Sequence, residues 1–278
     1  MNALTWLDGK PPATCAASSI DSLNRAIAYG DGLFETIAVV DGRARLLPLH
    51  LDRLRAGCRR LAIDLDEAAL QVEINNVIAA YREGVLKIII ARAGTERGYR
   101  AQTAAGSHRQ LQFFPQIVTR DFSSSPSAIL HLCRQRLSRQ PVLAGLKHLN
   151  RLEQVLARSE WSDPNIAEGL MLDTHGQVIE AVSSNIFWIS GGEVCTPALN
   201  QCGVAGVMRR VVTQYLSIKV YEKNCTLDDL YGAQEVFITS SLRGIQSVAQ
   251  LGCVHWPCGG VTIALQQQLQ SFLSKSLS

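Results

Sequence analysis

A single lysine, Lys147, stands in a stretch of mostly apolar or neutral residues, 144–150 (Ala-Gly-Leu-Lys-His-Leu-Asn). An amine that its neighbours remove from water loses its charge more readily than a surface amine does, and an uncharged amine can attack a carbonyl group. The apolar spacing that follows predicts a helix over residues 149–161. Taken alone, Lys147 also fits a surface lysine in front of a helix; residues downstream favour the chemical interpretation.

Glu180 is an acidic residue inside the apolar segment 178–182 (Val-Ile-Glu-Ala-Val). A buried carboxylate is costly unless a cation or a protonated group lies beside it. The protonated ring nitrogen of pyridoxal 5′-phosphate (PLP) would be such a partner, and a carboxylate at that position keeps the ring able to accept electrons. The simpler alternative is an exposed glutamate at the end of a strand.

Three groups of residues have the chemistry to hold a phosphate. Residues 203–206 (Gly-Val-Ala-Gly) lead into a helix predicted over 207–216, and a glycine turn before a helix offers backbone N–H groups and the positive end of the helix dipole. Residues 239–241 (Thr-Ser-Ser) end an apolar strand and add hydroxyl donors. Arg53 lies on a predicted helix and would form a bidentate contact with phosphate oxygens, although a solvated helix face is its plainer interpretation.

Strands and helices mix along the whole chain. Their patterns predict strands over 4–9, 32–40, 85–91, 111–119, 129–134, 168–173, 178–182, 185–189 and 236–239, and helices over 49–63, 66–82, 149–161, 207–216 and 261–273. Serine and proline over 121–127 predict a linker. We therefore expect an α+β protein with a small N-terminal domain over 1–120 and a larger C-terminal domain over 128–278.

Composition narrows the classes of function. Hydrophobic residues make up 47% of the 278 residues and charged residues 18%, which suits a globular core. The net charge of +3 is mild and the arginine pairs are isolated, so we expect no nucleic-acid partner; the apolar runs are too short for a membrane span. The eight cysteines form no Cys-x-x-Cys pair and the N-terminus does not read as a signal peptide, so we expect free thiols, a reducing compartment and no metal site.

The motifs, taken together, resemble the fold-type IV PLP-dependent enzymes, a family that includes branched-chain and D-amino-acid aminotransferases and aminodeoxychorismate lyases. The matching segments occur in the family's order and cover nearly the whole chain. They are 29–35 (Tyr-Gly-Asp-Gly-Leu-Phe-Glu), His50-x-x-Arg53-Leu54, Lys147, Glu180-x-x-x-Ser184-Asn185-Ile186-Phe187 and Gly203-Val204-x-Gly206-Val207-x-Arg209.

The resemblance implies a fold and a set of roles. The fold is a two-domain α+β architecture, with a smaller N-terminal α/β domain and a larger, mixed, barrel-like C-terminal domain that binds PLP. Lys147 would carry the cofactor covalently and Glu180 would face its ring nitrogen. The cofactor phosphate would be bound by four residues: Arg53, the helix-start residues Val207 and Met208, and Ser241. Thr36 would lie on the strand that lines the pocket.

Within the family, residues 144–156 and the pair Gly98-Tyr99 look like those of aminodeoxychorismate lyases. This resemblance implies a cytoplasmic, homodimeric enzyme of folate synthesis that converts 4-amino-4-deoxychorismate to 4-aminobenzoate and pyruvate. Because that substrate carries two carboxylates, pocket cations are expected. The candidates are Arg92, Arg97, Arg100 and Arg243.

Two alternatives remain open at this point. An acidic residue, Glu35, follows Phe34, as it often does in the aminotransferases of the family, which keeps a D- or branched-chain amino-acid aminotransferase in view. A protein that binds PLP, or only dimerises, without catalysing a reaction is the other alternative. The presence of both Lys147 and Glu180 argues against such a decayed site.

Overall fold

The computed structural model describes residues 4–10, 25–94, 98–101, 106–122 and 126–276. The chain divides into two compact units: unit 1 holds Met1–Val118 and Lys147–Asn150, and unit 2 holds Thr119–Leu146 and Arg151–Ser278. Part of the linker predicted over 121–127 lies outside the described residues, and the predicted domain boundaries stay predictions. The return of 147–150 to unit 1 separates Lys147 from its neighbours in the sequence.

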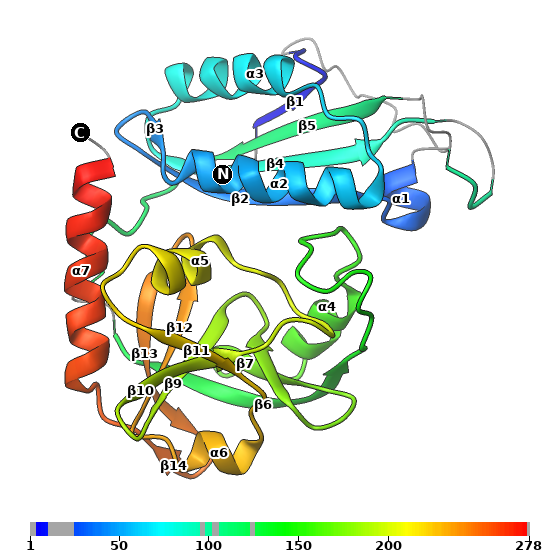
Figure 1. The fold of residues 1–278 in the computed structure, drawn as a ribbon. Helices are drawn as coiled ribbons and strands as arrows, with labels where there is room; N and C mark the ends of the chain where they lie inside the picture. Colours follow the sequence, from blue (N-terminus) through cyan, green and yellow to red (C-terminus); the bar gives the residue numbers. More distant parts are fainter. Residues whose placement is uncertain (1–3, 11–24, 95–97, 102–105, 123–125, 277–278) are drawn as a thin grey trace. The chain divides into compact units, whose positions relative to one another are not determined.

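Unit 1 is built on an antiparallel sheet of five strands in the order β1-β5-β4-β2-β3 (Figure 1). The strands are β1 (Leu4–Leu7), β2 (Gly32–Val40), β3 (Arg43–Ala44), β4 (Gly84–Arg92) and β5 (Ser107–Phe114). β2 has the predicted bounds, and the predicted hairpin turn follows it. Asp41 and Gly42 both have positive φ, 53° and 76°, the backbone form that a two-residue hairpin of the primed type requires.

The helices described in unit 1 contact this sheet, and the first of them is short: α1 (Arg25–Tyr29), α2 (Leu47–Leu61) and α3 (Glu67–Ala80). The predictions of 49–63 and 66–82 are confirmed to within about two residues. Asp66 caps α3, as its type suggests, because its side chain accepts the backbone N–H of Ala69 at 2.9 Å. α2 contacts β2, so residues from the helix and the strand can meet.

Unit 2 contains a closed ring of six strands. The order β9-β12-β13-β6-β7-β8 closes because β8 pairs back with β9 (Figure 1). The ring strands are β6 (Ala128–Leu137), β7 (Ile166–Asp173), β8 (Val178–Ala181), β9 (Asn185–Ser190), β12 (Glu235–Ser240) and β13 (Gly244–Leu251); β10 (Glu193–Pro197), β11 (Val220–Lys223) and β14 (Val254–His255) extend it. The expected barrel-like domain is therefore confirmed.

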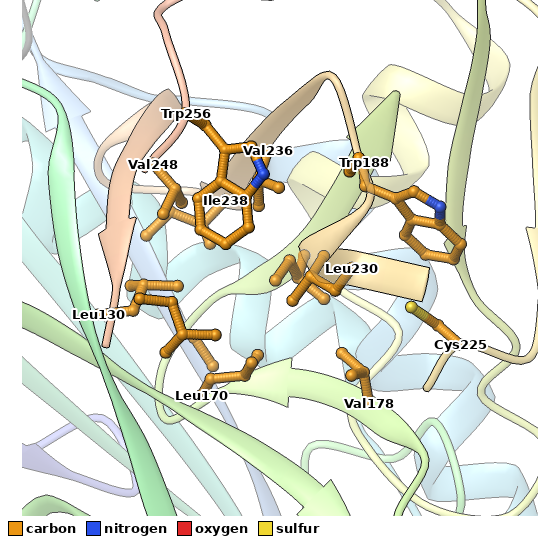
Figure 2. Packing of buried hydrophobic residues seen from close by; sticks show 14 of the residues in the cluster. Leu130, Leu170, Val178, Trp188, Cys225, Leu230, Val236, Ile238, Val248 and Trp256 are labelled. Atoms are coloured by element: carbon orange, nitrogen blue, oxygen red, sulfur yellow. The ribbon is translucent and has the colours of Figure 1, made fainter. Parts of the chain in front are cut away.

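The main buried cluster of unit 2 lies on one face of these strands. Figure 2 shows Trp188, Ile238 and Leu170 within the buried cluster. Side chains alternate along a strand, so the residues between them point to the other face, where Phe187 and Phe237 stack with ring centroids 4.8 Å apart. That second face also carries the polar residues described below.

Four helices belong to unit 2: α4 (Leu152–Arg158), α5 (Val207–Gln214), α6 (Leu227–Tyr231) and α7 (Gly260–Ser276). The helix predicted over 149–161 is wrong at its start. Leu149 lies outside the helix and donates its backbone N–H to the Gly32 carbonyl at 3.0 Å, and this pairing with β2 excludes helical hydrogen bonding there. Within the described residues, no helix combines the length and apolarity that a membrane crossing requires.

Candidate active site

Strand-like pairing with β2 fixes the backbone of Lys147. The backbone N–H of Phe34 donates to the Lys147 carbonyl at 2.9 Å, and that of Leu149 donates to Gly32 at 3.0 Å. Leu33 and His148 form a β-bridge between these two bonds. The root of the Lys147 side chain is thus held rigidly within unit 1, while its four-carbon stem keeps its rotatable bonds.

Lys147 shares an aromatic neighbour with a second lysine that the sequence analysis missed. Its Nζ lies 4.3 Å from the centroid of the Phe34 ring, and the Nζ of Lys87 lies 5.7 Å from the same centroid, both within cation–π range. Thr36 is two residues along β2 from Phe34, so it faces the same side of the sheet, and Lys87 is its partner in β4. The structure therefore brings three predicted or family-motif residues, Phe34, Thr36 and Lys147, to one side of the sheet.

Arg53 is held by a carboxylate from the opposite face of β2. Its Nε donates to Glu35 Oε1 at 2.8 Å and its Nη2 to Oε2 at 2.5 Å, which is a bidentate fork. His50 Nδ1 lies 2.6 Å from Oε2. Burial alone would raise the pKa of Glu35, but Arg53 and His50 hold it at about 2. Glu35 is therefore ionised. The ion pair is largely buried, because the side chains of Glu35 and Arg53 are 1% and 15% exposed.

In unit 2, Glu180 is a buried carboxylate with neutral hydrogen-bond donors. It is 4% exposed. The backbone N–H of Val204 donates to its Oε2 at 2.8 Å, and Asn185 Nδ2 approaches the same oxygen at 3.4 Å. Arg151 interacts with it electrostatically: burial lowers the pKa of Arg151, whereas Glu180 and Glu153 raise it. The groups of Val204 and Asn185 thus fix the orientation of the carboxylate, and Arg151 supplies a positive charge that interacts with it.

Asn185 ties this carboxylate to the start of α5. Its Nδ2 donates to the Val204 carbonyl at 2.8 Å, and its Oδ1 accepts the Gly206 N–H at 3.1 Å. No side chain caps α5, so the first N–H groups of the helix, at Val207 and Met208, have no intrahelical partner. A Cβ on Gly206 would lie 2.0 Å from Asn185 Oδ1, so any larger residue there would force the Asn185 amide to move.

A polar row crosses three strands of the ring on this face. Glu180, Asn185 and Thr239 are successive register partners in β8, β9 and β12. Thr239 is 1% exposed, and its Oγ1 has no hydrogen-bond partner among the described residues, which is costly for a buried hydroxyl. Ser241, predicted to contact phosphate, follows directly after β12. The row, with the uncapped start of α5, fits an anionic group and a protonated ring nitrogen.

The structure gives Arg92 partners within unit 1. Its Nε and Nη2 donate to Asp31 at 2.9 and 3.3 Å, and its Nη1 and Nη2 donate to the carbonyls of Ala62 and Leu61 at 2.5 Å each. These carbonyls are at the C-terminal end of α2, where a cation complements the helix dipole. Arg92 therefore serves the fold of unit 1, and its role toward a substrate stays a prediction.

Arg243 likewise has protein partners. It forms an ion pair with Glu168, a 3% exposed carboxylate that also accepts the hydroxyl of Ser184 at 3.1 Å. This contact holds the turn between β8 and β9 and so supports the polar row. Arg97 lies outside the described residues, and Arg100 is exposed. The roles of these arginines toward a substrate remain predictions.

Comparisons with known proteins show the family to which the chain belongs. Residues 32–251 match the family described as amino-transferase class IV. An aminodeoxychorismate lyase from Vibrio harveyi is 32% identical over 283 residues, covering 96% of this chain and 99% of its own. A 4-amino-4-deoxychorismate lyase structure from Pseudomonas aeruginosa superposes with a TM-score of 0.87 at 45% identity, covering 97% of this chain and 99% of that one. A branched-chain amino-acid aminotransferase from Escherichia coli has a TM-score of 0.83 at 20% identity, with 98% and 95% covered, and shows the shared fold alone.

Proposed function

The chain belongs to the class IV aminotransferase family, and we propose that it is a PLP-dependent lyase that converts 4-amino-4-deoxychorismate to 4-aminobenzoate and pyruvate. The cofactor expected from the sequence, PLP, is confirmed at the level of the family. The observation that carries the proposal is similarity over nearly the full length to two lyases of this kind, 32% and 45% identical, against 20% for the aminotransferase structure.

Each chemical group has one role in this proposal. Lys147 would attach the cofactor, and Glu180 would hold the proton of its ring nitrogen. Arg53 and the amides of Val207 and Met208 would bind the phosphate, because a guanidinium and a helix start both favour anions. Ser241 would add a weaker contact. The amide donors of Val204 and Asn185 support the role of Glu180, since they orient its carboxylate.

The proton chemistry belongs to Lys147. PLP, when bound, withdraws electrons from the substrate carbon that bears the amine. Lys147 Nζ would take the proton from that carbon, because the root of its side chain is fixed beside Phe34 while its stem can swing between positions. The bond between the adjacent carbon and the enolpyruvyl oxygen would break, and the released enolate would take a proton back from the Lys147 ammonium group to become pyruvate. The remaining ring becomes aromatic, which supplies driving force independent of the protein.

Lys87 is a candidate for binding a substrate carboxylate. It lies near the same Phe34 ring as Lys147, and as the register partner of Thr36 it is directed to the same face of the sheet. A dianionic substrate needs such charge, and Lys87 supplies it on a strand rather than a loop. The proposal therefore adds Lys87 to Arg92, Arg97 and Arg243, of which the described pair is already engaged by Asp31 and Glu168.

A direct assay tests the proposal. Purified protein with PLP is incubated with 4-amino-4-deoxychorismate, and 4-aminobenzoate is followed by its fluorescence, with pyruvate measured in parallel. Equal amounts of both products are expected. Lys147→Ala should give neither product and should lose the yellow, borohydride-sensitive colour of the bound cofactor. A wild-type protein that stays colourless in the presence of PLP would instead favour a non-catalytic protein.

An aminotransferase is the second candidate, because Glu35 follows Phe34. In the structure this acid pairs with Arg53 and His50 rather than with groups on the Phe34 side of β2, so it bears on cofactor binding more directly than on the choice of substrate. Incubation with D-alanine or branched-chain amino acids separates the two functions. Accumulation of pyridoxamine phosphate and a keto acid, without 4-aminobenzoate from the other substrate, would overturn the lyase proposal.

We also propose a homodimer in the cytoplasm. Leu152, Val155 and Leu156 of α4 are 69%, 57% and 51% exposed and share one helix face, an apolar stripe that a second subunit could cover. Buried free thiols such as Cys133 are in keeping with a reducing compartment. Light scattering measures the mass directly. Leu152→Glu should shift the protein towards the monomer, whereas Val72→Glu, at an exposed residue of α3, should not.

A further inference from the structure

We propose that Glu35 and His50 are positioning residues that hold the Arg53 guanidinium in the orientation needed to bind the cofactor phosphate. The inference rests on the proposed function, in which Arg53 is the phosphate-binding cation. It explains why two separate motifs, the acid after Phe34 and the His-x-x-Arg pattern, occur in one chain: they meet in space. Neither Glu35 nor His50 contacts the phosphate in this proposal.

The fork fixes the plane of the guanidinium. Arg53 Nε and Nη2 donate to the two oxygens of Glu35 at 2.8 and 2.5 Å, and such parallel bonds set orientation as well as distance. The guanidinium has one further edge for a bidentate contact, formed by Nη1 and Nη2. With the Nε and Nη2 edge held by a carboxylate that is 1% exposed, the direction of this second edge is set before the cofactor arrives. This lowers the ordering cost of binding.

His50 gives the Glu35 carboxylate a further hydrogen bond without adding a positive charge. Glu35 is ionised, so its oxygens only accept hydrogen bonds, and the 2.6 Å contact therefore requires a proton on His50 Nδ1. Burial lowers the pKa of His50, which keeps the ring neutral. Its Nε2 has no hydrogen-bond partner among the described residues, as suits an unprotonated nitrogen. Arg53 is thus the cation of the cluster, and Glu35 is held from two sides.

His50 and Arg53 come from consecutive turns of one helix face. Residues three apart on α2 lie on the same side, and Glu35 comes up from β2 to meet both. The cluster therefore also ties α2 to the sheet. A role confined to stability would predict loss of folding without any selective effect on the phosphate, so the test must separate phosphate recognition from folding.

Comparison of PLP with pyridoxal, which lacks the phosphate, makes that separation. The full-length protein is freed of cofactor and titrated with each compound, and binding is followed by the absorbance of the lysine-bound aldehyde. For Glu35→Gln we expect a Kd for PLP raised about tenfold, the scale of one charged hydrogen bond, and a Kd for pyridoxal changed less than about twofold. Glu73→Gln is the matched control, because Glu73 is also buried and pairs with an arginine, Arg109, at 2.8 Å. It should change neither Kd.

Several results would overturn the inference. Equal losses for PLP and pyridoxal would make the cluster purely structural, and tighter PLP binding in Glu35→Gln would make Glu35 a competitor of the phosphate. If Glu35→Gln does not fold, His50→Ala removes one hydrogen bond and leaves the fork, and a selective loss of about threefold for PLP is expected. An unchanged Kd for PLP in Arg53→Met would instead refute the role of Arg53 in the proposed function, and this outcome is distinguishable from the others.

Discussion

Two buried carboxylates, Glu35 in unit 1 and Glu180 in unit 2, are stabilised in different ways. Glu35 is 1% exposed and accepts a bidentate fork from Arg53 as well as a bond from His50. Glu180 is 4% exposed, and it accepts hydrogen bonds from the backbone amide of Val204 and from the side-chain amide of Asn185. Both satisfy the rule that a buried charge needs partners: a guanidinium fork holds Glu35, whereas amide groups orient Glu180, which also interacts electrostatically with Arg151.

The difference separates a carboxylate that orients another residue from one that can act on a ligand. In a fork, both carboxylate oxygens accept hydrogen bonds from the arginine. Such a carboxylate acts on a ligand by orienting that arginine. A carboxylate such as Glu180, whose orientation is set by a backbone amide and an asparagine amide, is suited to a protonated ring nitrogen. The comparison therefore predicts that Glu180 governs chemistry, whereas Glu35 governs phosphate affinity and stability.

The largest effect is expected from Glu180→Gln. The amide can still accept the Val204 N–H, so folding should be retained, but the negative charge that keeps the ring nitrogen protonated is lost. We expect kcat/KM for 4-aminobenzoate formation to fall about 10²- to 10³-fold, in the range found when one preorganised electrostatic contact is removed. The thermal midpoint should change little. Asp173→Asn is the control: Asp173 is 2% exposed in neighbouring β7, and it should keep its activity within about twofold.

The second largest effect is a loss of folding stability at acid pH. The pKa of Glu35 is held at about 2, below its usual 4.5, so its ion pairing stabilises the fold above pH 4.5 and this stabilisation is lost as the pH falls towards 2. The full loss amounts to about 3 kcal/mol, at roughly 1.4 kcal/mol for each pKa unit. Urea unfolding between pH 7 and pH 3 should therefore show a stability difference between wild type and Glu35→Gln that shrinks in acid. His50 acts in the same direction, because burial lowers its pKa and the folded chain resists its protonation. A difference that stays constant with pH would contradict this account.

Gly206→Ala tests the donors around Glu180 without touching Glu35. The new Cβ would lie 2.0 Å from Asn185 Oδ1, so the amide that links Gly206, Val204 and Glu180 has to move. We expect a loss of about 1–3 kcal/mol, the usual cost of overpacking, with weaker binding of PLP. Backbone strain does not contribute, since φ is −64°. Gly260→Ala has nothing within 4 Å of its Cβ, and should leave both quantities unchanged.

Local patterns were sufficient for the elements but not for the contacts between them. The β-branched run 32–40 and the cap at Asp66 both appear as predicted, because alternation and capping are short-range effects. The helical spacing behind Lys147 was misleading: residues 147–150 pair with β2 instead, a long-range contact that overrides local propensity. β13 was missed because Gln246 and Ser247 interrupt its apolar pattern.

The candidate site divides in the same way. Lys147 and Glu180 were identifiable by residue type and by family motif. The contacts of the candidate arginines were not, because their ion-pair partners lie far away in the sequence. Arg92 pairs with Asp31 across 61 residues, a separation that no local spacing reveals. Lys87 was overlooked within a strand read as uniformly buried. A charged residue inside an apolar strand is the signal that singled out Glu180. Lys87 shows the same signal and could have been identified in the same way.

The smallest expected effect is on the reactivity of two cysteines, one in the region of Glu35 and one in the region of Glu180. Burial raises the pKa of Cys58, on α2, and of Cys202, near Glu180, to about 12 each, so neither thiol reacts until its surroundings open. In Glu35→Gln, alkylation of Cys58 by iodoacetamide at pH 8 should accelerate about fivefold to tenfold, because unit 1 loses its link between α2 and β2, whereas Cys202 should keep its rate. Peptide mass spectrometry gives each rate, with exposed Cys253 as the internal standard. Equal acceleration at both cysteines would mean that the chain opens as a whole, and the separate behaviour of the two carboxylate regions would not hold.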